Sequence, residues 1–220
     1  MRRRRDWSLY LVTDRRIAGS RPLADVVAAA VRGGVTAVQL REKKCGTREF
    51  VELARSLQAL LAPCGVPLIV NDRVDVALAA GADGVHVGQS DMDCRDVRRL
   101  LGPHAIIGLS VETMEQAVGA SALDVDYLGV SPIFSTPTKA DTISEWGLGG
   151  LAALRRESKH ILVAIGGIHP SNVADVIKAG ADGIAVVSAI CAAPDPEAAA
   201  RDLRRAIDCL HPNRARGHRK

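Results

Sequence analysis

The stretch Ala80-Gly-Ala-Asp-Gly-Val85 recurs as Ala179-Gly-Ala-Asp-Gly-Ile184, and Gly33-Gly-Val-Thr-Ala-Val38 is a looser copy. In each copy a helical segment ends at a glycine, the residue that commonly follows the last turn of a helix. A short apolar run comes next, as expected of a buried strand. The repeated unit is therefore a helix that leads directly into a strand.

This alternation of short apolar runs and longer helical segments continues along the chain. The predicted strands are 8–13, 35–41, 67–71, 83–87, 105–109, 125–130, 161–165 and 183–187. The predicted helices lie near 22–33, 47–62, 74–80, 93–101, 112–121, 149–157, 170–179 and 195–209. Eight strand–helix units with nearly continuous apolar strands predict an α/β fold, a single (β/α)8 TIM barrel.

The main competing fold is an open doubly wound sheet. That fold usually carries a glycine-rich nucleotide-binding turn after its first strand, and Val12-Thr-Asp-Arg-Arg16 is not such a turn. No linker is long enough to divide the chain into two domains. We therefore expect one barrel domain over residues 8–209, with a basic tail before it (1–7) and another after it (210–220).

The composition limits the class of protein. With 220 residues, of which 47% are hydrophobic and 25% charged, the chain is typical of a soluble globular protein. Its five cysteines are scattered and odd in number, which suits a reducing cytoplasm and disfavours a disulfide framework or a zinc site. No apolar run reaches the roughly 18 residues that a membrane helix needs, so no membrane partner is expected.

The formal charge of +4 comes from the two ends of the chain. Residues 2–5 and 214–220 hold eight of the basic residues, and the rest of the chain carries 21 basic and 25 acidic residues. The basic ends lack interleaved aromatic residues and a nucleic-acid-binding fold, so nucleic acid is not an expected partner. The sequence leaves open whether the chain is a monomer or a homodimer.

The functional signal lies where the predicted strands end, because barrel enzymes carry their chemistry at the carboxyl ends of the strands. Gln39-Leu-Arg-Glu-Lys43 ends the second strand, and alternate residues of a strand share a face. Gln39, Arg41 and Lys43 should therefore point together and form a place for a phosphate or pyrophosphate. The alternative interpretation is an ordinary solvated strand end.

Two aspartates, Asp72 and Asp91, follow the next two predicted strands. Carboxylates on neighbouring strand ends suit Mg²⁺, which prefers oxygen ligands and commonly bridges one or two acids to substrate phosphates. Either aspartate could instead cap a helix. His86 lies in mid-strand between Val85 and Val87, so a histidine packed inside the barrel is the favoured interpretation.

A second anion site is indicated at the last two strands. Gly166-Gly167 and Val187-Ser188 follow the seventh and eighth predicted strands, where barrel enzymes commonly hold a phosphate on backbone N–H groups. Glycine allows the chain to approach such an anion closely. One anion site would thus be made of metal and cations, and the other of backbone.

Several short motifs, in this order along the chain, resemble the thiamine phosphate synthase family over residues 8–208. The motifs are Gln39-Leu-Arg-Glu-Lys43, Val70-Asn-Asp72, Gly84-Val-His-Val-Gly-Gln-Ser-Asp91, Gly108-Leu-Ser110, Thr136-Pro-Thr-Lys139, Ala164-Ile-Gly-Gly-Ile168 and Val186-Val-Ser-Ala-Ile190. The resemblance implies a transferase that joins 4-amino-2-methyl-5-(diphosphooxymethyl)pyrimidine to a thiazole phosphate and releases pyrophosphate. It also implies Mg²⁺ as the cofactor and these two small molecules as partners.

The resemblance implies a role for individual residues. The pyrimidine diphosphate would be bound by Gln39, Leu40, Arg41, Glu42, Lys43, Asn71, Ser110 and Lys139, of which Arg41, Lys43, Ser110 and Lys139 are the catalytic candidates. The thiazole phosphate would be bound by Thr136, Pro137, Thr138, Gly167, Val187 and Ser188. The metal ligands would be Asp72 and Asp91. In the implied reaction pyrophosphate leaves first, and the thiazole nitrogen then captures the cation that remains on the pyrimidine.

Two features depart from the family pattern. Glu112 stands where relatives often carry a histidine, and Ser144-Glu-Trp146 is an unusual sequence within the loop Ser135–Gly147, which is long and polar enough to be a lid. A thiazole tautomerase shares the fold, but such relatives lose the metal acids and use a histidine where this chain has Pro132. A non-catalytic phosphate-binding barrel is the other alternative, and it would need neither the two acids nor Lys139.

Overall fold

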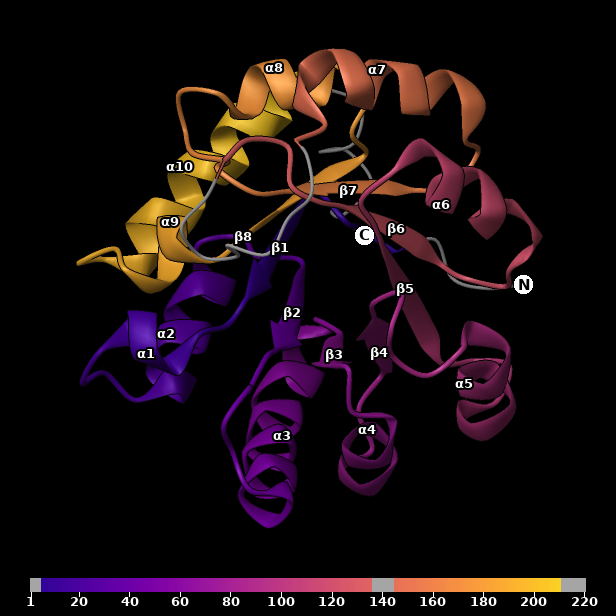
Figure 1. The fold of residues 1–220 in the computed structure, drawn as a ribbon. Helices are drawn as coiled ribbons and strands as arrows, with labels where there is room; N and C mark the ends of the chain where they lie inside the picture. The colour runs from indigo at the N-terminus through magenta and orange to yellow at the C-terminus, as the bar shows by residue number, and fades with distance from the viewer. Residues whose placement is uncertain (1–4, 136–144, 211–220) are drawn as a thin grey trace.

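The structure is a computed structural model that describes residues 5–135 and 145–210. Eight parallel strands form a closed barrel in which each strand pairs with its neighbour in sequence and β8 pairs with β1 (Figure 1). The strands are β1 (Leu9–Val12), β2 (Ala37–Leu40), β3 (Leu68–Asn71), β4 (Gly84–Val87), β5 (Ile106–Val111), β6 (Tyr127–Val130), β7 (Leu162–Ile165) and β8 (Gly183–Val186). The predicted TIM barrel is confirmed, and each strand overlaps its predicted range.

Helices surround this barrel (Figure 1). They are α1 (Arg15–Ala18), α2 (Leu23–Arg32), α3 (Thr47–Leu61), α4 (Val74–Ala80), α5 (Cys94–Leu101), α6 (Met114–Gly119), α7 (Gly147–Glu157), α8 (Val173–Lys178), α9 (Ser188–Cys191) and α10 (Pro196–Asp208), with short 3-10 turns at Ala62–Cys64 and Ala120–Ala122. The eight predicted helices are present with ends that differ by no more than three residues. The sequence did not predict α1 and α9, which follow the first and last strands and contain only four residues each.

Side chains alternate between the two sides of the barrel wall. On β1, Leu9 and Leu11 pack outward against the helices, while Tyr10 belongs to a separate apolar cluster inside the barrel. The rings of Trp7, Tyr10 and Tyr127 contact one another in this inner cluster. The inner cluster packs the interior of the barrel.

The internal repeat has a structural role at the amino-terminal ends of the strands. Asp83, just before β4, accepts a hydrogen bond from the Leu68 N–H at 2.9 Å, and its own N–H donates to the Leu68 carbonyl at 3.0 Å. Asp182, just before β8, makes the same pair of bonds with Leu162 of β7. The repeated aspartate therefore ties the start of one strand to the start of the next, and it satisfies a strand N–H that would otherwise lack a partner in the ladder.

The two ends of the described chain close the barrel together. The Ile184 N–H donates to the Ser8 carbonyl at 3.1 Å, which pairs the last strand with the first. Arg204 of α10 reaches Asp6 at 3.1 Å and joins the last helix to the entry of β1. Helix α10 also packs on α2, so the ring of helices closes at the same place as the ring of strands.

Trp7 is buried beneath the barrel, so the packed body of the protein begins before residue 8, inside the segment expected to be a basic tail. Residues 1–4 and 211–220, which make up most of the two expected tails, lie outside the described residues. Within residues 5–135 and 145–210, no helix combines the length and the apolar composition that crossing a membrane requires.

Candidate active site

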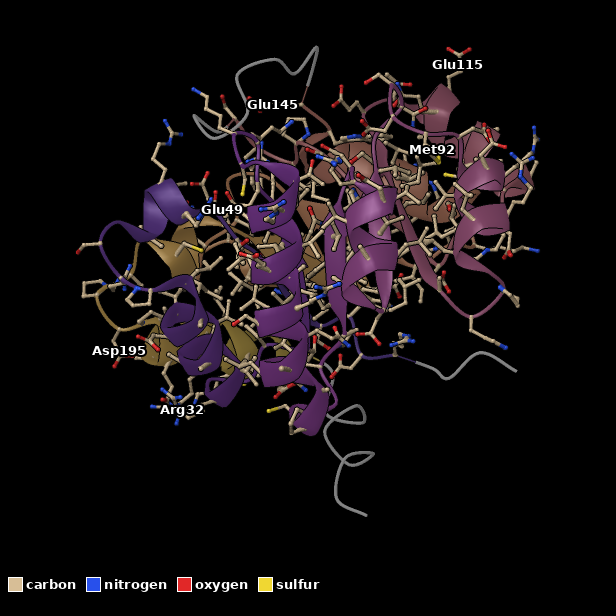
Figure 2. The ribbon with its side chains drawn as sticks, turned by 90° about the horizontal axis from the view of Figure 1, so that it is seen from below. Arg32, Glu49, Met92, Glu115, Glu145 and Asp195 are labelled. Carbon is tan, nitrogen blue, oxygen red and sulfur yellow. The ribbon has the colours of Figure 1, made fainter. Side chains whose placement is uncertain are left out.

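A cavity of about 790 Å³ opens at the carboxyl-terminal end of the barrel. Figure 2 shows Met92 and Glu115, which come after β4 and β5, at one end of the molecule, with Arg32 of α2 toward the other end. Ten residues predicted for the site line the cavity: Gln39, Arg41, Lys43, Asn71, Asp72, Asp91, Ser110, Gly167, Val187 and Ser188. The closed barrel therefore brings together side chains that are up to about 150 residues apart in the sequence.

The end of β2 shows the expected alternation. Gln39, Arg41 and Lys43 all line the cavity. Leu40 is instead fully buried in the outer apolar cluster, and Glu42 pairs with an arginine of α1 at 2.9 Å. The side chains of Leu40 and Glu42, both predicted as substrate contacts, are thus directed away from the cavity, because a strand turns every second residue to its other face.

Asp72 and Asp91 form a carboxylate pair at the ends of β3 and β4. Burial and the neighbouring Asp91 raise the pKa of Asp72 to about 6, while Lys43, whose Nζ lies 4.0 Å from Asp72 Oδ2, acts in the opposite direction. Asp91 is held in place by the Gly88 N–H, which donates to its Oδ2 at 2.7 Å. Two carboxylates this close repel each other, and a proton or a cation between them relieves that repulsion.

Neither member of the pair caps a helix. Arg73 occupies the N-cap position of α4, and α5 is capped by Asp93, which accepts a hydrogen bond from the Arg95 N–H at 2.8 Å. Asp72 has a φ of 63° and is the one non-glycine residue with a positive φ in the described part of the chain. Aspartate tolerates this left-handed conformation better than most residues do.

The carboxylate pair fits Mg²⁺. This ion is usually held by one or two carboxylates, with water and substrate phosphate oxygens at its other positions. Among residues 5–135 and 145–210 there is no group of three or more acidic, histidine or cysteine side chains arranged to hold a metal, so the donor set here is the pair itself. Because the pair lines a cavity next to Lys43, a phosphate could approach the ion directly.

The turns that follow β7 and β8 form another part of the cavity wall. Gly166 and Gly167 follow β7 with φ values of 110° and 64°, and a Cβ added to Gly167 would lie 2.8 Å from the Cβ of Phe134. A Cβ added to Gly166 would likewise lie 2.8 Å from the Cβ of Pro132, so both glycines are required by conformation and by space. Val187 and Ser188 follow β8, with Ser188 as the first residue of α9. Gly166, Gly167, Val187 and Ser188 all line the cavity.

The sequence interpretation missed a set of polar residues beneath the cavity. His86 is buried, as predicted, but it also makes specific contacts, with Nδ1 2.9 Å from Tyr127 OH and Nε2 2.8 Å from Ser110 Oγ. Tyr10 and Tyr127 line the same cavity. Tyr10, His86 and Tyr127 occupy strand positions whose side chains face the barrel interior, and the alternation of side chains along each strand is a sequence signal that could have revealed them.

The remaining predicted residues lie outside the part of the chain that the structure describes: Thr136, Pro137, Thr138 and Lys139. Most of the loop expected to be a lid also falls within 136–144. At its described ends Ser135 lines the cavity, and Trp146 Nε1 donates to the Val111 carbonyl at 3.3 Å. Glu112, the residue that departs from the family pattern, also lines the cavity.

A cavity of this kind at the carboxyl end of a closed parallel barrel defines the class of protein, a TIM-barrel enzyme. The family model described as thiamine monophosphate synthase matches residues 9–190. The chain therefore belongs to the thiamine monophosphate synthase family, and the resemblance seen in its motifs is confirmed.

Individual relatives agree with this assignment. The thiamine-phosphate synthase of Albidiferax ferrireducens is 62% identical over 202 residues, which cover 92% of each chain. That of Syntrophomonas wolfei is 54% identical over 199 residues, covering 90% of this chain and 95% of the relative. The solved thiamine phosphate pyrophosphorylase from Pyrococcus furiosus is 40% identical and superimposes with a TM-score of 0.85 over 94% of this chain and 98% of that one.

Proposed function

We propose that the chain condenses 4-amino-2-methyl-5-(diphosphooxymethyl)pyrimidine with a thiazole phosphate to give thiamine phosphate and pyrophosphate. The observation that carries this proposal is the pair of Asp72 and Asp91 beside Lys43, at the wall of a cavity of about 790 Å³. That volume is within the range of pockets that bind small molecules. Membership of the thiamine monophosphate synthase family supports the overall reaction.

The diphosphate of the pyrimidine substrate would bind at the ends of β2 and β3. Arg41, Lys43 and Asn71 all line the cavity there and offer two cations and an amide. Gln39 and Ser110 would contact the pyrimidine ring, because they lie on the inward faces of β2 and β5. The proposed contacts of Leu40 and Glu42 would be made through their backbone, since their side chains face away from the cavity.

Asp72 and Asp91 would hold Mg²⁺, which supplies positive charge to the phosphate oxygens of a leaving group. Arg41 and Lys43 add fixed positive charge at the same place, and the proposed Lys139 would add a third. Charge stabilisation of this kind needs no proton transfer, so the reaction needs no general base.

The thiazole phosphate would bind at the ends of β7 and β8. Gly167, Val187 and Ser188 line the cavity there, and their backbone N–H groups suit a phosphate. The proposed contacts Thr136, Pro137 and Thr138 would complete this half of the site.

The proposed reaction breaks the bond between the pyrimidine methylene carbon and the diphosphate oxygen, and the electron pair leaves with the oxygen. The lone pair of the thiazole nitrogen then forms the new carbon–nitrogen bond, so charge balances without a proton. Val12, Val163 and Ile165 line the cavity and exclude water from the intermediate cation. We also propose a cytoplasmic location, which is supported by five cysteines that are all free thiols.

The test is pyrophosphate release from the two substrates with and without Mg²⁺. Asp91→Ala should lower turnover on the order of 10²-fold, because a metal contributes several kcal/mol to such a step, and excess Mg²⁺ should restore part of it. Asp93→Ala is the matched control, since it removes a carboxylate two residues away that only caps α5. It should lower stability by about 1 kcal/mol and leave turnover unchanged.

The same assay separates the alternatives. Isomerisation of a thiazole carboxylate phosphate without pyrophosphate release would indicate a tautomerase. Binding of both ligands without any turnover would indicate a non-catalytic barrel. An Asp91→Ala variant as active as the unmodified enzyme would contradict the proposed metal site.

A further inference from the structure

A chain of hydrogen bonds crosses the interior of the barrel beneath the cavity. Gln39 Nε2 donates to Tyr10 OH at 3.1 Å, and the hydroxyls of Tyr10 and Tyr127 lie 2.9 Å apart. Tyr127 OH lies 2.9 Å from His86 Nδ1, and His86 Nε2 lies 2.8 Å from Ser110 Oγ. The two ends of this chain, Gln39 and Ser110, are residues proposed above to bind the pyrimidine. Its three middle members, Tyr10, Tyr127 and His86, have no role in the proposed reaction.

One order of the protons gives every group along this chain a partner. The Gln39 N–H donates to Tyr10 OH, and in the order that continues in the same direction Tyr10 donates to Tyr127. Burial raises the pKa of both tyrosines, so both stay protonated and able to donate. In this order Tyr127 donates to His86 Nδ1, which leaves Nε2 as the protonated ring nitrogen. Nε2–H donates to Ser110 Oγ, and the serine proton is left for the cavity.

Glycines keep the space that these rings occupy. Gly108 of β5 is paired in register with His86 on one side and with Tyr127 on the other. A Cβ at Gly108 would lie 2.2 Å from Tyr127 Cζ and 2.4 Å from His86 Nδ1. A Cβ at Gly129 of β6 would lie 2.8 Å from His86 Cε1. Because all three distances are below van der Waals contact, side chains at these two positions would displace the rings.

We propose that Tyr10, Tyr127 and His86 are positioning residues that fix the hydrogen-bond roles of Gln39 and Ser110 toward the pyrimidine substrate. This inference rests on the proposed function. With Nε2 engaged by Tyr10, Gln39 offers its carbonyl oxygen as an acceptor, while Ser110 offers a proton. An aminopyrimidine has the complementary groups, an amino group that donates and ring nitrogens that accept. This chain of hydrogen bonds, the relay, thereby favours amino heterocycles. A site with fixed hydrogen-bond roles rejects a ligand whose donors and acceptors are exchanged.

The first test reads the protons directly, in the full-length enzyme without substrate. The chain has six histidines, and in long-range ¹⁵N–¹H spectra of histidine-labelled protein the signals of His86 are those lost in His86→Gln. We expect the proton on Nε2 and a hydrogen-bonded, unprotonated Nδ1. A proton on Nδ1, or one on each nitrogen, would overturn the proposal.

The second test compares two variants that each remove one buried hydroxyl, Tyr127→Phe and Tyr10→Phe. Only Tyr127→Phe removes the donor to His86, so only this variant should move the Nδ1 resonance toward that of a ring nitrogen without a hydrogen bond. Tyr127→Phe should also raise the KM for the pyrimidine diphosphate about tenfold, the effect of one lost hydrogen bond. The KM for the thiazole phosphate should stay within about twofold, because its contacts lie at other strands.

A purely structural role for the tyrosines would give a different result. Both variants would then lose stability without a selective change at Nδ1, or both Michaelis constants would rise together, and either result would overturn the relay. The two proposals can also fail separately. A wild-type enzyme that releases no pyrophosphate would refute the proposed function, whereas the ring-nitrogen spectra would still decide the proton order.

Discussion

Asp72 combines an unusual backbone conformation with a raised pKa. Its φ of 63° costs on the order of 1 kcal/mol in a residue other than glycine. Burial and the adjacent Asp91 raise its pKa to about 6, so its charged form is also disfavoured. The strained backbone and the disfavoured charge thus belong to the same carboxylate, which lines the cavity. A cation bound there would offset the electrostatic cost.

We expect the affinity for Mg²⁺ in the absence of substrates to fall as the pH drops from 7.5 to 5.5. A proton and the metal compete for the same oxygens, and the pKa of Asp72 lies within this window. The effect on folding has the opposite sign. A carboxyl whose pKa is raised by folding stabilises the metal-free protein at a pH below the ordinary carboxyl pKa near 4. This contribution to stability is lost as the pH rises through about 6. Calorimetric titration and Tm measurements with and without Mg²⁺ at each pH would check both statements.

Asp72→Asn is the control for this prediction, because asparagine tolerates a positive φ but does not titrate in this range. The variant should bind Mg²⁺ weakly at every pH, and its metal-free Tm at pH 7.5 should equal or exceed that of the unmodified protein. If Asp72→Asn kept the same Mg²⁺ affinity with the same pH dependence, the carboxylate pair would not be the metal site.

At the scale of single elements, the alternation of each strand decides which side chains reach the cavity. That rule placed Gln39, Arg41 and Lys43 correctly from the sequence, since strand geometry has a fixed period of two. Applied to the first and sixth strands, it would also have placed Tyr10 and Tyr127 inside the barrel. Leu40 and Glu42 were predicted as substrate contacts because the family motif is a continuous run of residues. Their side chains do not line the cavity, because they occupy the alternate positions that face the other side of the strand.

Other features of the elements were beyond the reach of the sequence. The sequence allowed Asp91 as the N-cap of the following helix, but the structure has Asp93 in that position. The end of a helix depends on the exact path of the preceding loop. The positive φ of Asp72 has no sequence signal, because aspartate is common in ordinary turns. The hydrogen bonds of His86 depend on the register between β4, β5 and β6, which becomes known only when the barrel is built.

The repeated aspartates allow a prediction at this scale. Asp83→Ala should destabilise the protein by about 1–3 kcal/mol, because the Leu68 N–H loses its acceptor at the start of β3. For a chain of this size that is a loss of roughly 2–12 °C in Tm. The residue lies at the amino-terminal end of the strands, away from the cavity, so kcat should be unchanged. Thermal unfolding and steady-state kinetics would be measured on the same preparation.

Asp83→Asn is the matched variant, since its amide carbonyl can still accept from the Leu68 N–H. It should recover most of the stability lost in Asp83→Ala. Equal losses in the two variants would mean that the charge matters and the backbone hydrogen bond does not.

At the scale of the whole molecule, closure of the barrel is what makes the candidate site. Gln39 and Asp72 lie at the ends of β2 and β3, and Ser188 follows β8. These residues line one cavity only because β8 pairs with β1 and closes the barrel. The seam between these strands is tight. A Cβ at Gly183 would lie 1.7 Å from the Trp7 carbonyl oxygen, which belongs to the backbone and cannot swing away.

Gly183→Ala should therefore weaken the closed barrel as a unit. Overpacking against backbone at this seam should cost at least about 3 kcal/mol, a decrease of roughly 6–12 °C in Tm. Gly119→Ala at the end of α6 is the control, because a Cβ there meets nothing within 4 Å and alanine is the better helix residue. Its Tm should stay the same or rise slightly. Circular dichroism melts of both variants give the comparison, and a Gly183→Ala protein as stable as the Gly119→Ala protein would show that closure does not depend on this contact.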